Sequence, residues 1–119
     1  MNVAVVILNW NGKTLLEEFL PSVVENSSGA KIYLADNASN DDSVSFTAEM
    51  FPSVEIIRNH SNSGYAGGYN EALKDLSEEI WVLLNNDVEV SPGWLDPILD
   101  GFAKDPKLVA AQPKILDYK

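Results

Sequence analysis

The side chains best suited to chemistry in this sequence are carboxamides and carboxylates that follow four short apolar segments. They are Asn9 and Asn11, then Asp36, then Asn59, and finally Asn85, Asn86 and Asp87. A carboxamide both donates and accepts hydrogen bonds, as the edges of a base or a ribose require, and a carboxylate binds divalent cations. Asparagine and aspartate also close turns, which is an equally good interpretation of any single position. Together the four positions favour a polar binding site.

A glycine-rich segment, residues 62–70, adds a second kind of candidate. It holds Asn62, Gly64, Gly67 and Asn70. Glycine lets the backbone approach a ligand closely, and the free N–H groups at the start of a helix attract negative charge. A flexible turn is the alternative interpretation. The pattern therefore indicates a place where a phosphate can lie against the backbone.

Solid apolar runs must position these residues, and they cover residues 3–8, 32–35, 54–57 and 80–84. Runs without alternation indicate strands buried on both faces, which is typical of a parallel sheet between helices. Helical patterns cover 13–25, 40–50, 66–76 and 92–103, with Ser91 as the cap and Pro92 in the first turn of the last. A final run, 108–111, predicts an edge strand. The sum is a doubly wound α/β domain, whose ligands bind at the carboxyl ends of the strands.

Composition and charge narrow the class of protein. The 119 residues are 45% hydrophobic, as in one globular domain, and include no cysteine, which excludes disulfides and thiolate metal sites. The 18 acidic and 8 basic residues give a formal net charge of −10. Nucleic-acid binding requires clustered Lys and Arg, so we expect no nucleic-acid partner, and a phosphate ligand needs another cation. No apolar stretch is long enough for a transmembrane segment.

Two common phosphate-binding motifs do not fit the sequence. Gly12, Lys13 and Thr14 follow the first run, like the end of a P-loop, but that motif requires glycine at the position of Ile7. The glycine cluster of residues 64–68 follows the third run instead of the first, so it is not a dinucleotide fingerprint. The pattern is therefore that of neither a P-loop protein nor a simple Rossmann dehydrogenase.

Four motifs in order, at residues 9–12, 36–41, 62–70 and 84–88, resemble the amino-terminal half of a family 2 glycosyltransferase, in its rhamnosyltransferase-like branch. The resemblance covers nearly the whole chain. It implies the GT-A fold, a Rossmann-like, doubly wound and mostly parallel sheet with helices on both faces, here truncated. It also implies the inverting transfer of a sugar from a UDP- or dTDP-type nucleoside diphosphate sugar to an acceptor hydroxyl.

The same resemblance implies roles for individual residues. Asp36 would accept a hydrogen bond from the imino N–H of uracil or thymine. Asp87 stands at the last position of the family's D-x-D motif, which binds a divalent cation, Mg²⁺ or Mn²⁺, between the donor phosphates. Asn85 replaces the first aspartate, so we expect it to support the ion from outside its ligand set and the ion to bind weakly without donor. The other nucleotide contacts are expected at Asn9, Asn11, Asn62, Gly64, Gly67, Asn70 and Asn86.

The catalytic base and the acceptor part are not expected within this sequence. In the family, the general base lies beyond the matched stretch, and so beyond Lys119 here. We therefore expect residues 1–119 to be a single donor-binding domain without its acceptor part, and inactive alone. In the full-length protein the acceptor would be a glycan or a lipid-linked molecule, and the location cytoplasmic or at the inner membrane face. A nucleotidyltransferase and a non-catalytic α/β nucleotide-binding module stay open as alternatives.

Overall fold

The computed structural model describes residues 2–105, 107–108, 110–112 and 116 of the chain. Its centre is a four-stranded sheet of β1 (Val3–Asn9), β2 (Ala30–Asp36), β3 (Glu55–Arg58) and β4 (Ile80–Asn85). All neighbouring strands are parallel, and their order in space is β3-β2-β1-β4. The solid apolar runs thus form the parallel sheet that they predict.

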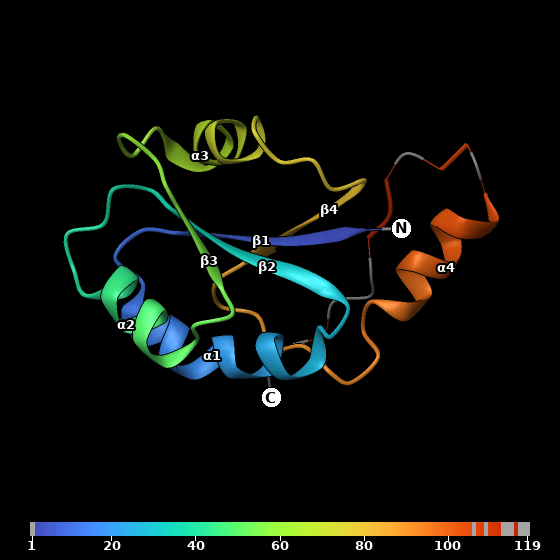
Figure 1. Ribbon diagram of the computed structural model, residues 1–119, viewed down its shortest axis with the longest axis horizontal. Helices are drawn as coiled ribbons and strands as arrows, with labels where there is room; N and C mark the ends of the chain where they lie inside the picture. The colour runs from blue at the N-terminus through green and yellow to red at the C-terminus, as the bar shows by residue number, and fades with distance from the viewer. Residues whose placement is uncertain (1, 106, 109, 113–115, 117–119) are drawn as a thin grey trace.

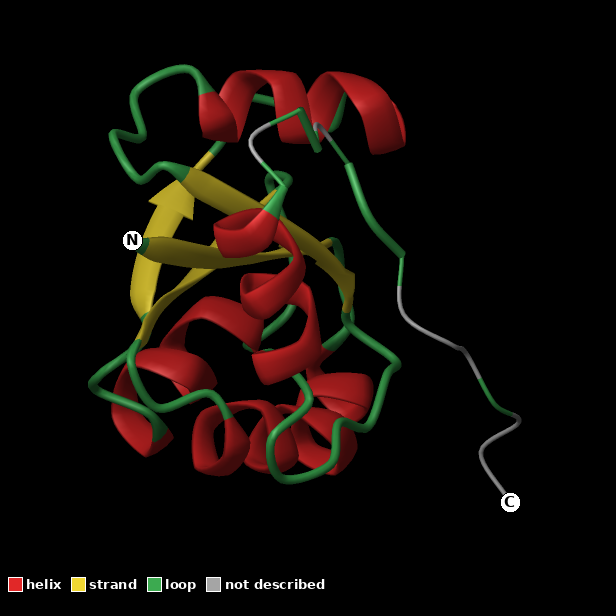
Figure 2. Cartoon of the chain, turned by 90° about the vertical axis from the view of Figure 1, so that its right-hand side faces the viewer, coloured by secondary structure: helices red, strands yellow, loops and turns green. Residues whose placement is uncertain are grey.

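Helices cover both faces of this sheet (Figure 1). The helices α1 (Lys13–Asn26) and α2 (Ser43–Met50) lie on one face, and α3 (Gly64–Leu73) lies on the other. The fourth helix, α4 (Asp96–Lys104), lies beside one end of the sheet, and Figure 2 shows the strands between helices above and below. The predicted doubly wound α/β fold with helices on both faces is therefore confirmed, because α1, α2 and α3 are the crossovers that parallel strands require.

The two layers of core share β1, whose residues alternate between them. Val5 and Ile7 pack on the side of α1, where the predicted apolar stripe is buried, and Ala4 and Val6 pack on the side of α3. Each fully buried side chain of Leu or Val size contributes roughly 1.5–3 kcal/mol of transfer free energy. In the described part of the chain, no helix combines the length and the hydrophobicity needed to cross a membrane.

The last helix begins later than the sequence predicts. It starts at Asp96, so the prediction that Ser91 caps it and Pro92 lies in its first turn is wrong. Gly93 has a φ of 75°, which a helix cannot accommodate, and Trp94 N donates instead to the Ser91 carbonyl in a turn.

The edge strand predicted at 108–111 is also wrong. Leu108 follows α4 in a turn, where its N–H donates to the Asp105 carbonyl at 3.1 Å, and neither Ala110 nor Ala111 lies in a strand. Residue 109 lies outside the described residues. The third helix runs from Gly64 to Leu73 instead of 66–76, because the chain turns at Leu76, whose N–H donates to the Leu73 carbonyl.

The strand order reverses at β1, which has β2 on one side and β4 on the other. At the carboxyl ends of these strands, Asn9 lies opposite Asp36 and Leu8 lies opposite Asn85. In open α/β sheets, ligands bind in the crevice outside such a reversal. The predicted polar residues therefore gather where this topology places a binding site.

Candidate functional site

A chain of hydrogen bonds links the carboxyl ends of β4, β1 and β2. Asn86 Nδ2 donates to Asn9 Oδ1 at 3.0 Å, and Asn9 Nδ2 donates in turn to Asp36 Oδ1 at 3.1 Å. Asn9 is only 1% exposed, so both ends of its amide bond within the protein. Asn9 therefore ties the three strand ends together, and in this geometry it acts on a nucleotide only through its neighbours.

Asp36 is buried in the same network. Its Oδ1 also accepts from Ser39 Oγ at 2.7 Å, and its Oδ2 accepts from Ser39 N at 2.9 Å. These donors compensate for the removal of the charge from water. Oδ2 accepts a single one of these bonds, so it retains the capacity for one further donor.

The loop after β1 is joined to the loop after β2 through Asn11. This residue has a left-handed backbone with a φ of 49°, which asparagine tolerates better than most residues. Its N–H donates to Ser39 Oγ at 2.9 Å, and its Oδ1 accepts from Asn40 N at 2.7 Å. The exposed Asn11 thus holds both loops at the rim of the site.

Asp41 anchors the starts of α1 and α2. Its carboxylate accepts hydrogen bonds from the Ser43 N–H and hydroxyl and, at 3.2 Å, from Lys13 N. Burial alone would raise the pKa of Asp41, but these hydrogen bonds outweigh it and hold the pKa below its usual value. The charged form of Asp41 is therefore the one that stabilises this junction.

A second network of carboxamides fixes the start of α3. Asn59 Nδ2 donates to Asn37 Oδ1 at 2.9 Å and to the Gly68 carbonyl at 3.0 Å. Asn37 Nδ2 donates to Asn62 Oδ1 at 3.0 Å and to the Gly64 carbonyl at 3.1 Å. The Oδ1 atom of Asn59 is buried without a hydrogen-bond partner among the described residues. The side chains after β2 and β3 therefore hold the glycine-rich segment in place.

Of the remaining predicted residues of that segment, the two glycines are required by the backbone conformation and Asn70 is exposed to solvent. Gly64 has a φ of 81°, which only glycine adopts at little cost. A Cβ atom on Gly67 would lie 2.8 Å from Ser63 Oγ, so this position also requires glycine. Asn70 is exposed on α3, and its side chain makes no hydrogen bond within the described part of the chain. No contact among the described residues distinguishes Asn70 as a site residue.

A cavity of about 260 Å³ lies beside the end of β4. It is lined by Leu8, Tyr65, Asn85, Asn86 and Asp87. Asp87 is exposed, and its carboxylate accepts no hydrogen bond from any described residue. Both of its oxygens are therefore available to a ligand.

The donor set of this cavity fits a cation only if the ligand completes the coordination. The described residues include no group of three or more His, Cys, Asp or Glu side chains that could hold a metal ion. The oxygens at hand are the Asp87 carboxylate and the amide of Asn85. Mg²⁺ is commonly bound in this way, through one or two carboxylates together with the phosphates of a substrate.

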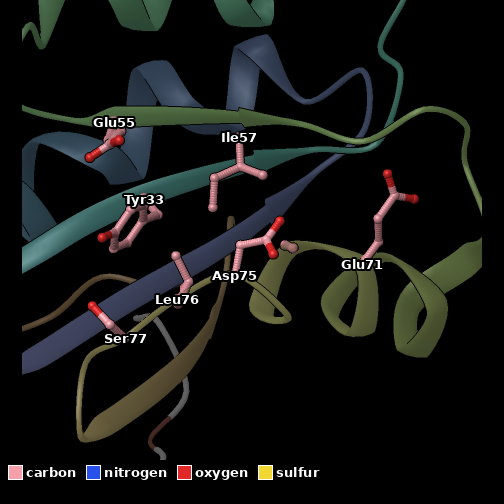
Figure 3. A pocket seen from close by; sticks show the side chains of 8 residues that line it. Tyr33, Glu55, Ile57, Glu71, Asp75, Leu76 and Ser77 are labelled. Carbon is pink, nitrogen blue, oxygen red and sulfur yellow. The ribbon is translucent and has the colours of Figure 1, made fainter.

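A second cavity, of about 280 Å³, lies away from the strand ends, between β2, β3 and the end of α3 (Figure 3). Its lining includes Glu55, Asp75 and Tyr33, and also Glu71, whose carboxylate turns toward the loop after β3 and accepts a hydrogen bond from His60 N at 2.8 Å. Burial, together with a hydrogen bond from the hydroxyl to Glu78, raises the pKa of Tyr33 to about 12. The acidic walls would repel a diphosphate, so this cavity is the poorer candidate for one.

The sequence places Asn59 at this edge but assigns no individual role to it, nor to Ser39, Asn37 or Tyr65. Ser39, Asn37 and Asn59 carry much of the hydrogen bonding of the edge, and Tyr65 lines the cavity beside Asp87. Ser39 stands three residues after Asp36, a spacing at which a carboxylate bonds the local backbone, and this signal was available. An exposed tyrosine in a glycine-rich segment carries no such signal.

The chain is similar to glycosyltransferases in sequence. A family model described as "Glycosyl transferase family 2" matches residues 4–117. The chain is 29% identical over 125 residues to N-acetylglucosaminyl-diphospho-decaprenol L-rhamnosyltransferase of Mycobacterium tuberculosis. This alignment covers 95% of the chain and 41% of the relative, so the chain spans about two-fifths of that protein's length.

The chain is also similar in structure to solved proteins. The mannosyltransferase PcManGT from Pyrobaculum calidifontis, in complex with GDP-Man and Mn²⁺, superposes with a TM-score of 0.77 at 25% identity. That match covers 89% of this chain and 33% of the mannosyltransferase. TarS 1–349 of S. aureus, in complex with UDP-GlcNAc, superposes with a TM-score of 0.76 at 17% identity over 87% of this chain and 32% of TarS, and so supports the fold alone.

Proposed function

The chain belongs to glycosyl transferase family 2, and on that premise we propose that it binds a nucleoside diphosphate sugar across the carboxyl ends of β2, β1 and β4. In this proposal it is the donor-binding part of an inverting glycosyltransferase. The observation that carries the proposal is the pair of carboxylates at this edge. Asp36 is held within a network and keeps one free acceptor position, whereas Asp87 is exposed and makes no hydrogen bond to a described residue.

The base of the nucleotide would lie at the end of β2. A uracil or thymine ring presents an imino N–H, and the remaining acceptor position of Asp36 Oδ2 suits that donor. Ser39 and Asn9 hold the Asp36 carboxylate in one orientation, so little ordering is left for the moment of binding. Asn11, at the rim, is placed to meet the ribose or the edge of the base.

The diphosphate would lie over the cavity at the end of β4. Asp87 would hold a divalent cation, with the Asn85 amide beside it outside its ligand set, and the cation would stabilise the negative charge of a departing nucleoside diphosphate. The net charge of −10 makes such a cation necessary, because few basic groups are available to attract phosphate. Asn86 keeps its place next to Asp87 through its bond to Asn9.

The acceptor in the whole protein would be a hydroxyl of a glycan or of a lipid-linked molecule. The matched relative from M. tuberculosis is described as acting on N-acetylglucosaminyl-diphospho-decaprenol, a lipid-linked compound. We extend this chemistry to the whole protein and infer a place on the cytoplasmic side of a membrane. The general base would come from a part of the protein that lies beyond Lys119.

Calorimetric titration tests the donor site directly. UDP, dTDP, GDP and ATP are titrated into the protein with and without Mn²⁺, and into the variants Asp87→Asn and Asp75→Asn. We expect a nucleoside diphosphate to bind more tightly with Mn²⁺, and this enhancement to be lost in Asp87→Asn. Asp75→Asn removes a carboxylate from the second cavity and should bind like the wild type.

Three results would contradict the proposal. Equal binding of the nucleotides with and without Mn²⁺ would remove the role of Asp87. A loss of binding in Asp75→Asn, but not in Asp87→Asn, would place the ligand in the second cavity. Preference for ATP over every diphosphate would favour a nucleotidyltransferase instead.

A further inference from the structure

Tyr65 lies beside the proposed cation site, and no role is predicted for it from the sequence. It is the second residue of α3, is 62% exposed, and lines the same cavity as Asp87. Its hydroxyl donates a hydrogen bond to Asn85 Oδ1 at 3.2 Å. Asn85 makes no other side-chain hydrogen bond within the described residues, so Tyr65 alone orients its amide.

The tyrosine ring is held firmly despite its exposure. It packs edge-to-face on Tyr69, with 5.0 Å between the ring centroids and 73° between the ring planes. Tyr69 is 3% exposed, and its hydroxyl donates to the Leu84 carbonyl at 3.1 Å, next to Asn85 in β4. The two rings therefore connect the first turns of α3 to the end of β4.

We propose that Tyr65 is a positioning residue of the donor site, whose hydroxyl orients the Asn85 amide oxygen toward the cation and diphosphate and whose ring forms one wall of their cavity. The inference rests on the proposed function and adds a residue to it. An amide oxygen has two lone pairs, so Oδ1 accepts from Tyr65 and still faces a ligand with the other. Without Tyr65, the exposed amide turns freely and as often presents its NH₂ group, which repels a cation.

A purely structural role predicts a different environment for the hydroxyl. Hydrogen bonds that stabilise a fold measurably are those whose loss leaves a buried group without a partner. The Tyr69 hydroxyl is of that kind, because it lies in the core between α3 and the sheet. The hydrogen bond of Tyr65 is exposed to solvent, so its removal leaves both partners free to bond water.

The contrast between the two tyrosines supplies a matched experiment. Tyr65→Phe and Tyr69→Phe each remove one hydroxyl from the same ring pair, four residues apart on α3. Thermal melting and calorimetric titration with UDP, dTDP and GDP, each with and without Mn²⁺, are measured for both variants, for the wild type and for Asp87→Asn.

In Tyr65→Phe we expect an unchanged melting temperature and an enhancement by Mn²⁺ that falls about fivefold, as the loss of one hydrogen bond of ordinary strength gives. In Tyr69→Phe we expect a lower melting temperature and a wild-type enhancement by Mn²⁺. Asp87→Asn should lose the enhancement altogether.

The outcomes separate the inference from the function on which it rests. If Mn²⁺ enhances binding to the wild type and not to Asp87→Asn, while Tyr65→Phe keeps the full enhancement, the role of Tyr65 is refuted and the proposed function stands. If the melting temperature of Tyr65→Phe is lowered as in Tyr69→Phe, and the effect of Mn²⁺ is unchanged, the role of Tyr65 is structural and the inference is refuted too. A wild type without any enhancement overturns both.

Discussion

Gly12 packs so closely against Asn9, at the end of β1, and Asn86, just after β4, that one methyl group should disturb this carboxamide pair. A Cβ atom on Gly12 would lie 2.5 Å from Asn9 Oδ1 and closer still to Asn86 Nδ2. Asn9 is 1% exposed and bonded to Asp36, so its Oδ1 stays in contact with the new methyl group, whereas Asn86 can turn away. The φ of Gly12 is −106°, which alanine adopts freely, so the clash is the only steric penalty.

The size of the effect in Gly12→Ala follows from this geometry. Overpacking costs about 1–3 kcal/mol, and a buried acceptor left without its donor, here Asn9 Oδ1, costs about as much. Asn86 relieves its own contact by giving up that bond, whereas the contact with Asn9 Oδ1 remains, so the two costs partly replace one another and we expect about 2 kcal/mol in total. The entropy of unfolding, at roughly 2.1 cal/mol/K per residue, then gives a fall of about 8 °C in the melting temperature.

The assay is thermal and urea unfolding followed by circular dichroism, with Gly101→Ala as the matched control. A Cβ atom on Gly101 would meet Leu108 at 3.5 Å, an ordinary contact, within α4. That substitution should stabilise the protein by about 0.5–1 kcal/mol, since alanine is preferred to glycine inside a helix.

A melting temperature of Gly12→Ala equal to that of Gly101→Ala would refute the reasoning. A double variant gives a second check on the cause. In an Asn86→Ala background one of the two clash partners is gone and Asn9 Oδ1 remains, so adding Gly12→Ala should cost less than in the wild type. Additive losses in the two variants would show that Gly12 and Asn86 do not interact.

Two further predictions concern titration and burial. Asp41 has a lowered pKa in the folded protein, so its contribution to stability is complete at neutral pH and is lost as the pH falls below about 4. In urea unfolding between pH 2 and 7, the free energy of unfolding should therefore fall less steeply toward low pH in Asp41→Asn than in the wild type. An equally steep fall in the variant would contradict this. Asn59→Asp places a buried carboxylate against two acceptors, the Asn37 amide oxygen and the Gly68 carbonyl, and should cost on the order of 3 kcal/mol at pH 7. Acidification should relieve part of that cost because a protonated carboxyl donates, and Asn59→Asp with wild-type stability at pH 7 would show that these contacts are not formed.

The sheet could be predicted because its signal is one of composition. A strand such as β1, buried on both faces, must be apolar throughout, and the run at its position leaves little choice of structure. The start of α4 could not be predicted in the same way. Proline and serine at positions 92 and 91 suit a helix start, but the left-handed backbone of Gly93 overrides them, and no local pattern announces which glycine adopts that conformation.

The site was predictable in its place and not in its internal bonding. Carboxamides after parallel strands must meet at one edge, which the register of Asn9 with Asp36 bears out. A carboxamide is both donor and acceptor, so its type does not say whether it bonds a ligand or another carboxamide. Burial decides: Asn37 and Asn59 are buried and bond each other, and the buried Asn9 bonds Asn86 and Asp36. Burial depends on contacts between distant segments, which spacing along the chain does not encode.

The electrostatics of the edge explain why a chain this acidic can be suited to a diphosphate. Most polar groups at the strand ends are neutral amides, and the charge of Asp36 is compensated by Asn9 and Ser39. Asp87 is the one carboxylate of the cavity at the end of β4 and lacks hydrogen-bond donors among the described residues. A single exposed carboxylate attracts a divalent cation only weakly, because water screens their interaction. Phosphate oxygens that share the cation add the missing ligands and charge, so this geometry favours a cation that arrives with the diphosphate over one that is resident.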